Sequence, residues 1–162
     1  MKKSLYIVLA VIVAFSGYAI WNSIEDQPAG EPEKVEVVGM DFSKELILKE
    51  MEYDKDKDIL SYAVENNTGK ILDYGLAFNL MKLQEDSTLK ETGLTDEMAF
   101  LEILLSVEHG NNAQDEILFE LIEKTIEPGR YYVIRKYTDR EGNVHIPEVS
   151  FEVTENNILP AK

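Results

Sequence analysis

Apolar and polar residues alternate with a period of two along most of the chain beyond residue 44. Because successive side chains of a strand point to opposite faces, this pattern predicts half-buried strands. The clearest run places five even-numbered residues on one face, which we expect to line a core: Leu72, Tyr74, Leu76, Phe78 and Leu80.

Six other segments show weaker forms of the same alternation, and turn-forming Gly, Asn, Asp and Pro residues separate them. They cover residues 44–53, 58–66, 101–107, 117–121, 130–136 and 149–153. The first should turn Ile47, Met51 and Tyr53 to one face. The third should bury Leu101, Ile103, Leu105 and Val107. About seven strands with turns between them predict an all-β antiparallel sandwich.

The segment from Glu85 to Met98 is polar and irregular. We expect a long loop there, with at most one helical turn near Thr95. The sandwich should span residues 44–155, and residues 156–162 should form a C-terminal tail.

The chain begins with two lysines and an apolar run, Leu5–Trp21. Basic residues before an apolar run keep that end in the cytoplasm, so the rest should be exported. Seventeen helical residues span roughly 25 Å, slightly less than a bilayer core. The run therefore fits a retained single-span anchor, and Trp21 would suit its interfacial end.

A cleaved signal peptide is the alternative, because Gly17 and Ala19 are the small residues that a cleavage site needs. A buried helix of a soluble protein is a third possibility, but such a helix would be apolar on every face. Residues 22–43, polar and rich in Pro and Gly at the start, should be a spacer between this segment and the sandwich.

The charge of the chain is strongly negative, with 31 acidic and 16 basic residues. Without Lys2 and Lys3, the part after the apolar run has a net charge of −17. Such a surface repels phosphate backbones, so the sequence predicts no binding to nucleic acid. The absence of cysteine excludes disulfides, thiol nucleophiles and a lipid-modified cysteine.

Candidate catalytic and metal-binding patterns are weak. Asp54, Asp56 and Asp58 have the alternate spacing of a calcium loop, but Ile59 stands where that loop needs glycine. A solvated hairpin tip fits them better. His109 and His145 lie in or beside turns without a second ligand at metal spacing, so exposed turn residues are expected.

No serine lies in a Gly-x-Ser-x-Gly elbow. We therefore predict no enzyme, no cofactor and no metal site. Asn66-Asn67-Thr68 matches a glycosylation sequon, and we interpret it as a turn.

One basic cluster stands out in this acidic chain: Arg130, Arg135, Lys136 and Arg140, interleaved with tyrosines. It is a candidate interaction patch for an envelope protein or an anionic wall polymer. The alternative is that these cations balance neighbouring carboxylates across the sheet.

Three motifs in order resemble a bacterial immunoglobulin-like domain family of Gram-positive membrane-anchored and cell-surface proteins. They are Val64-Glu65-Asn66-Asn67-Thr68, the strand from Tyr74 to Leu83, and Pro128-Gly129-Arg130-Tyr131 running into the next strand. The resemblance covers roughly residues 44 to 154. It implies an immunoglobulin-like sandwich and an adhesion, spacing or sensing role.

In such sandwiches, a tyrosine after the turn often forms a corner by bonding to nearby backbone. Pro128 and Gly129 would make that turn and Tyr131 the corner, with Tyr132 as the alternative. A weaker resemblance is to small bacterial proteinase inhibitors with a sandwich fold.

The function expected from the sequence is a non-catalytic extracytoplasmic module, tethered to the membrane, that serves interaction or sensing. An inhibitor acting through the loop between Glu85 and Met98, or a structural part of a membrane complex, are the alternatives. A secreted protein results if the signal is cleaved. The sequence does not indicate an oligomeric state.

Overall fold

A computed structural model describes residues 37–155 and 157–160. Within those residues, no helix is both long and apolar enough to span a membrane. The anchor or signal peptide predicted at Leu5–Trp21, and most of the spacer, lie outside the described residues.

The first sheet has three antiparallel strands in the order β1-β2-β7. They are β1 (Leu46–Asp54), β2 (Ile59–Asn66) and β7 (Asn112–Leu118). A charged turn joins β1 to β2, as the sequence predicts. Leu60, Tyr62 and Val64 of β2 are buried, because they form one face of a regular strand.

The other strands form a four-stranded and a five-stranded sheet, in the orders β10-β9-β3-β6 and β12-β11-β8-β4-β5. The four-stranded sheet contains β3 (Leu72–Tyr74), β6 (Leu105–Val107), β9 (Tyr137–Asp139) and β10 (Val144–His145). The five-stranded sheet contains β4 (Asn79–Leu83), β5 (Leu89–Glu91), β8 (Gly129–Ile134), β11 (Ser150–Val153) and β12 (Ile158–Pro160).

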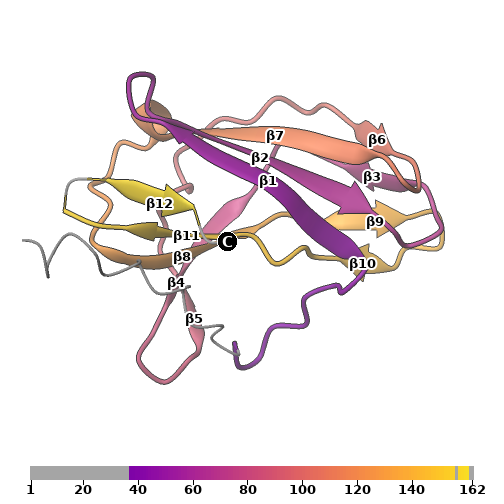
Figure 1. The fold of residues 1–162 in the computed structure, drawn as a ribbon, viewed down its shortest axis with the longest axis horizontal. Helices are drawn as coiled ribbons and strands as arrows, with labels where there is room; N and C mark the ends of the chain where they lie inside the picture. Colours follow the sequence, from indigo (N-terminus) through magenta and orange to yellow (C-terminus); the bar gives the residue numbers. More distant parts are fainter. Residues whose placement is uncertain (1–36, 156, 161–162) are drawn as a thin grey trace, which may run out of the picture. The chain divides into compact units, whose positions relative to one another are not determined.

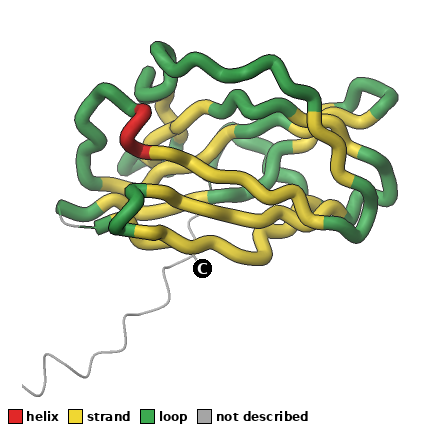
Figure 2. The backbone as a smooth tube through the Cα atoms, turned by 90° about the horizontal axis from the view of Figure 1, so that it is seen from above, coloured by secondary structure: helices red, strands yellow, loops and turns green. Residues whose placement is uncertain are grey.

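Figure 1 shows the long strands β1, β2 and β7 running along the domain, with the five-stranded sheet toward one end and the four-stranded sheet toward the other. Figure 2 shows strands joined by loops, and the one short helix of the described residues is the 3₁₀ turn η1 (Phe119–Leu121). The all-β antiparallel prediction is therefore confirmed.

The described residues hold twelve strands, so the expectation of about seven is wrong. One predicted strand, 72–80, is split into β3 and β4, which belong to different sheets. Two short strands, β9 and β10, follow β8, and β5 lies in the predicted long loop. The last strand that was not expected is β12, which lies within the predicted tail and pairs with β11. Two- and three-residue strands carry too little alternation to be found in a sequence.

A β-bulge in β1 changes which residues in the first half of the strand face the core. The pairing passes from Leu48↔Val64 to Glu50↔Ala63, so Lys49 is the extra residue. Leu48 and Met51 therefore pack against the core, and Ile47 is 42% exposed. The expectation that Ile47 faces inward with Met51 and Tyr53 is wrong, because the bulge changes the phase of the alternation.

The predicted third run is mostly outside the core. Leu101 and Ile103 are exposed, and only β6 forms a strand there, with Val107 buried. Between Leu94 and Glu97 the chain makes one turn, in which the Met98 amide bonds the Thr95 carbonyl, as expected near Thr95.

The core between the sheets is rich in aromatic side chains. Phe119 meets Phe151 edge to face at 5.6 Å, and Tyr131 stacks on Phe151 at 5.7 Å. At the N-terminal end of the described residues, Phe42 of the predicted spacer stacks on Tyr132. The end of that spacer is therefore packed on the sandwich.

Candidate functional site

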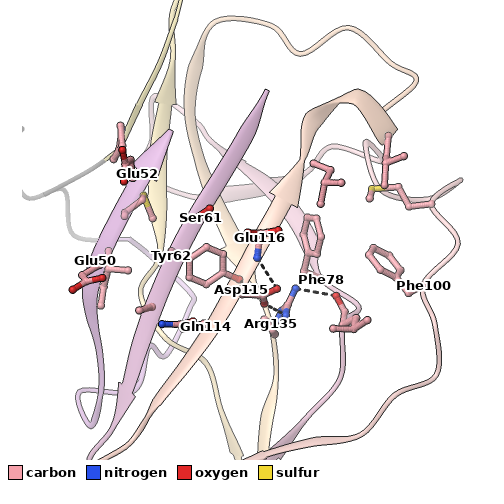
Figure 3. A pocket seen from close by; sticks show the side chains of 18 of the residues that line it. Glu50, Glu52, Ser61, Tyr62, Phe78, Phe100, Gln114, Asp115, Glu116 and Arg135 are labelled. Atoms are coloured by element: carbon pink, nitrogen blue, oxygen red, sulfur yellow. Dashed lines mark hydrogen bonds and ion pairs between the residues drawn. The ribbon is translucent and has the colours of Figure 1, made fainter. Parts of the chain in front are cut away.

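An open groove of about 1270 Å³ runs along the three-stranded sheet and past the outer side of β7. Its walls come from β1, β2 and β7 on one side and from the segment 98–101 on the other. Figure 3 shows Phe78 and Arg135 between β7 and the segment that carries Phe100. This groove is our candidate functional site.

The floor of the groove is a buried ion pair between Arg135 and Asp115. The Arg135 side chain is 2% exposed, and its Nη2 donates to the Leu76 carbonyl at 2.9 Å. Its guanidinium lies 5.5 Å from the Phe78 ring centroid, in a cation–π contact. Bonds to a carboxylate and a carbonyl compensate the cost of burying this cation.

The Asp115 carboxylate has two further donors. The Tyr62 hydroxyl donates to Oδ2 at 3.2 Å, and the backbone amide of Glu116 donates to Oδ1 at 2.9 Å. Burial raises the pKa of the Tyr62 phenol, with Arg135 acting in the opposite direction. Tyr62 therefore stays neutral at physiological pH and remains a hydrogen-bond donor.

Apolar side chains form the wall of the groove opposite the sheet. Phe78 and Phe100 meet edge to face with centroids 5.4 Å apart, and Met98 and Leu101 extend that wall. Leu118 and Leu121 line the end of the groove at the carboxyl end of β7. Such a mixture of apolar walls and a few fixed polar groups is typical of a binding surface.

Three acidic side chains form the rim: Glu50, Glu52 and Glu116. The two cations of the groove are already paired, Lys49 with Glu65 at 3.2 Å and Arg135 with Asp115. The groove is therefore apolar with a negative rim.

The structure does not gather the predicted basic patch on one surface. Arg135 is buried, whereas Lys136 and Arg140 are exposed and Arg130 is half-buried. Arg130 is 4.0 Å from Glu152 across the β8–β11 pair. The patch prediction is wrong for Arg135. Its side chain points to the same inner face as the buried Val133 and Tyr137, two residues before and after it. The alternative, in which the cations balance neighbouring carboxylates, holds for Arg135 and Arg130.

The Pro128-Gly129 turn leads into β8, and the Tyr131 hydroxyl donates to the Glu127 carbonyl at 2.8 Å. That is the backbone bond by which a tyrosine corner is recognised. Gly129 has φ of 145°, and a Cβ there would lie 2.7 Å from Lys82 Cε. Lys82 in turn pairs with Glu127 at 3.1 Å and lies over the Tyr131 ring.

The predicted hairpin tip at Asp54–Asp58 holds its carboxylates apart in separate contacts. Asp54 Oδ1 accepts the amides of Asp56 and Lys57, and Asp58 accepts the Tyr53 hydroxyl at 2.5 Å. No group of three metal-ligating side chains occurs in residues 37–155 and 157–160.

The sequon residue Asn66 is completely buried. Its Nδ2 donates to the carbonyls of Lys70 and Val107, and its Oδ1 accepts from Thr68. Gly69 completes the turn with a positive φ of 74°. Asn66 therefore organises a turn, as interpreted from the sequence.

A second polar cluster lies at the β9–β10 turn. Lys70 pairs with Asp139 at 2.7 Å and also contacts Glu141. The bonds from Lys70 and Asn143, together with the backbone amides, hold the pKa of Asp139 well below its usual range. The same carboxylates raise the pKa of Lys70 to about 12.

The two histidines have different partners. His109 is exposed and accepts the Gly69 amide at 3.3 Å. His145 lies on β10 with its Nε2 3.7 Å from Asp139, and it is 19% exposed. The expectation of an exposed turn residue holds for His109 and is wrong for His145, which the β9–β10 pairing partly covers.

Sequence reasoning missed Asp115 and the groove it helps to form. A usable signal was present, because Asp115 has the inward phase of Ala113 and Ile117, and Arg135 has that of Val133 and Tyr137. Opposite charges in two inward registers of a sandwich indicate a buried pair. The free wall at 98–101 had no such signal.

One family model, described as "Bacterial Ig-like domain", matches residues 41–155. That range contains every strand except β12, and it agrees with the resemblance seen between about residues 44 and 154. No curated protein matches the chain.

Proposed function

Because the chain belongs to the bacterial Ig-like domain family, we propose that it is a non-catalytic extracytoplasmic module for interaction or sensing at the envelope of a Gram-positive cell. In this proposal Leu5–Trp21 tethers the module to the membrane, with the C-terminal domain outside. The observation that carries the proposal is the family match over almost the whole sandwich.

The chemistry of the groove supports binding rather than turnover. Its one buried cation is held by a carboxylate and a backbone carbonyl, so neither charge is available to activate a substrate. Tyr62 is neutral and donates to the same carboxylate. The remaining lining combines apolar side chains with solvated carboxylates and a few other polar groups, which suits recognition of another molecule.

The distribution of charge supports export. The two lysines before Leu5 are the only basic residues before Lys34, and the acidic residues begin at Glu25. This asymmetry favours the orientation with the N-terminus in the cytoplasm. No feature of the described residues favours the inhibitor or the membrane-complex alternative.

Protease shaving of intact cells tests the location. The chain is expressed with a C-terminal epitope tag, and an added protease should remove the tag from intact cells while a cytoplasmic marker survives. Membrane fractionation follows, and the tag should sediment with membranes. A variant with Ala19→Leu and Gly17→Leu, which removes the small residues of the cleavage site, should behave in the same way if the segment is retained.

A tag that resists protease until the cells are lysed would contradict the extracytoplasmic part of the proposal. A tag recovered in the culture medium, and returned to the membrane by the Ala19→Leu and Gly17→Leu changes, would replace the tether by a cleaved signal peptide.

A further inference from the structure

We propose that the outer edge of β7 and the apolar wall beside it are the docking site for an extended segment of a partner protein that carries alternating apolar and basic side chains. This inference rests on the proposed role as an interaction module. It adds the surface and the chemistry of the partner.

The first observation is that β7 is an edge strand. Within the described residues it pairs with β2 only. The bonds at both ends of the ladder, Asn66 N to Asn111 O and Phe119 N to Asp58 O, fix its phase. Alternation then turns the backbone groups of Ala113, Asp115 and Ile117 to β2 and those of Gln114, Glu116 and Leu118 outward.

Only some of these outward backbone amides and carbonyls have a hydrogen-bond partner. Asp115 Oδ1 accepts the Glu116 amide, which is independent support for the outward direction of that amide. No other backbone bond in the described residues reaches the outer side of Gln114, Glu116 or Leu118. Both edges of this sheet have a neighbour, β12 beside β1 and β6 beside β7, but within the described residues no backbone bond joins β6 to β7. An unpaired edge is a template for a further strand.

The second observation is an apolar wall with unusual exposure. Leu101 is 70% exposed and Leu104 is 74% exposed, and Ile103 between them is also exposed. Leu101 lines the groove together with Phe100, and Leu121 adds an exposed side chain at its end. Leu101, Leu121 and the half-buried Phe100 therefore give the groove an apolar surface that is open to solvent, and such a surface indicates a contact site.

The third observation is the charge of the rim, which decides the occupant. Lys49 and Arg135, the two cations of the groove, pair with Glu65 and Asp115, so they do not neutralise the three glutamates of the rim. Lys57, on the turn between β1 and β2, attracts Glu116 electrostatically. An added strand would place its side chains alternately toward the apolar wall and toward this rim. Apolar and basic residues in alternation complement both.

The same charge argues against two other occupants. A second copy paired through β7 would bring two Glu116 rims together on chains of net charge −15. Residues 22–36 of this chain carry five acidic residues and one lysine, so they do not complement the rim either. A basic partner segment fits without repulsion.

The test uses the full chain in neutral lipid nanodiscs and a fluorescent eight-residue peptide of alternating lysine and valine. A control peptide has the same residues but is N-methylated at alternate amides, so that it keeps the charge and cannot pair as a strand. Fluorescence anisotropy gives the affinity, and hydrogen exchange with mass spectrometry shows where the peptide binds. The first peptide should protect residues 112–118, and the control peptide should bind at least tenfold more weakly because main-chain bonds provide affinity.

Matched variants locate the site. The double change Leu101→Ser with Leu104→Ser should weaken peptide binding at least tenfold, since Leu101 is an exposed side chain of the groove wall and Leu104 is the exposed leucine that follows it along the chain. Val144→Ser, also exposed but outside the groove, is the apolar control. Glu116→Lys should weaken binding, and Glu155→Lys, exposed and outside the groove, is the charge control. Gln114→Pro removes an outward amide, and the protection of residues 112–118 should be lost.

Equal binding of the N-methylated peptide, protection elsewhere in the chain, or unchanged affinity of the Leu101→Ser and Leu104→Ser variant would each overturn the docking site. Concentration-dependent protection of residues 112–118 without peptide would also overturn it, in favour of a second copy. None of these results bears on the shaving experiment. A chain that resists shaving but shows the β7 protection would contradict the proposed location and leave the docking site intact.

Discussion

Two runs with alternating apolar residues, Leu72–Leu80 and Leu101–Val107, differ in how far the structure buries them. In the first run, Leu72, Tyr74, Phe78 and Leu80 are buried. In the second, only Val107 is buried, and both Leu101 and Ile103 are exposed. The alternation of the second run is weaker, because Leu104 is apolar where a polar residue is expected, but four apolar residues still share one face. That shared face does not by itself decide whether a run enters the core.

The buried run is bound to other strands along its length. Lys70, just before β3, pairs with Asp139 of β9, and β3 pairs with β9 on one side and β6 on the other. In the break between β3 and β4, the Leu76 carbonyl accepts from Arg135. β4 then pairs with both β8 and β5.

The second run has few such bonds before β6. The Ile103 amide bonds the Leu101 carbonyl two residues away, which closes a tight local turn and adds no neighbouring strand. Leu101 therefore lies on the surface, in the wall of the groove. We conclude that strand neighbours and polar contacts at breaks decide burial, and that an apolar run without them is free to serve a binding surface.

Among the substitutions that test this difference, Arg135→Met should lower the free energy of unfolding most. The change leaves the Asp115 carboxylate in the groove floor without its cation and leaves the Leu76 carbonyl without its donor. Breaking a buried pair in this way should lower the free energy of unfolding by about 3–5 kcal/mol. Urea denaturation followed by circular dichroism measures it.

The control for Arg135→Met is the double change with Asp115→Leu, which removes both charges. It should recover much of the loss, because no unpaired carboxylate remains. A single variant as stable as the parent chain would show that the pair does not hold the break between β3 and β4.

Leu80→Ala should have the next largest effect. Leu80 is 1% exposed on β4, and loss of its side chain leaves a cavity among well-packed neighbours. The expected loss is about 2–5 kcal/mol in the free energy of unfolding. Urea denaturation is again the measurement, and a loss below about 1 kcal/mol would mean that the second half of this run is not part of the core.

Acid should weaken the start of the buried run. The pKa of Asp139 is lowered in the folded chain, so the carboxylate contributes stability above the unfolded pKa near 4, and this contribution is lost as the pH falls through the folded value. The pKa of Lys70 is raised to about 12, so its contribution is complete below the unfolded value and is lost as the pH rises through 12.

Asp139→Asn should flatten the acid side of the stability curve, measured as urea midpoints between pH 2 and pH 7. Its effect should be smaller than that of Arg135→Met, since the asparagine oxygen can still accept the amides of Glu141 and Asn143. Glu141→Gln is the control, because this exposed residue shares Lys70 but accepts no backbone amide. An unchanged acid slope in Asp139→Asn would assign the slope to other carboxylates.

Much of the fold could be predicted from the sequence because regular strands leave a period-two record. The face of β2, the turn at Asn66–Gly69 and the Pro128-Gly129 entry to β8 are local features of that kind. The bulge at Lys49 and the break after Tyr74 could not be predicted, since they depend on the partner strands that each segment meets. Short strands such as β10 carry no usable period at all.

The candidate groove also depends on which strands become neighbours, and the sequence does not specify this. Asp115 and Arg135 are twenty residues apart, and only the packing of β7 against the chain after β8 brings them together. Their inward phases could have indicated a pair. Nothing in the sequence distinguishes the exposed Leu101 from the buried Leu72, because exposure here follows from the absence of a neighbouring strand.

The smallest effect on stability should come from Leu101→Ser combined with Leu104→Ser. Both side chains are more than two-thirds exposed, so their loss removes little buried apolar area, and the free energy of unfolding should change by no more than about 0.5 kcal/mol per substitution. Urea denaturation gives the value, with the Val144→Ser variant as the exposed control on another strand. A loss as large as that of Leu80→Ala would mean that the second run is part of the core after all. If stability is unchanged, a loss of peptide binding in the same variant comes from the surface beside β7. That outcome would show that the second run serves binding rather than folding.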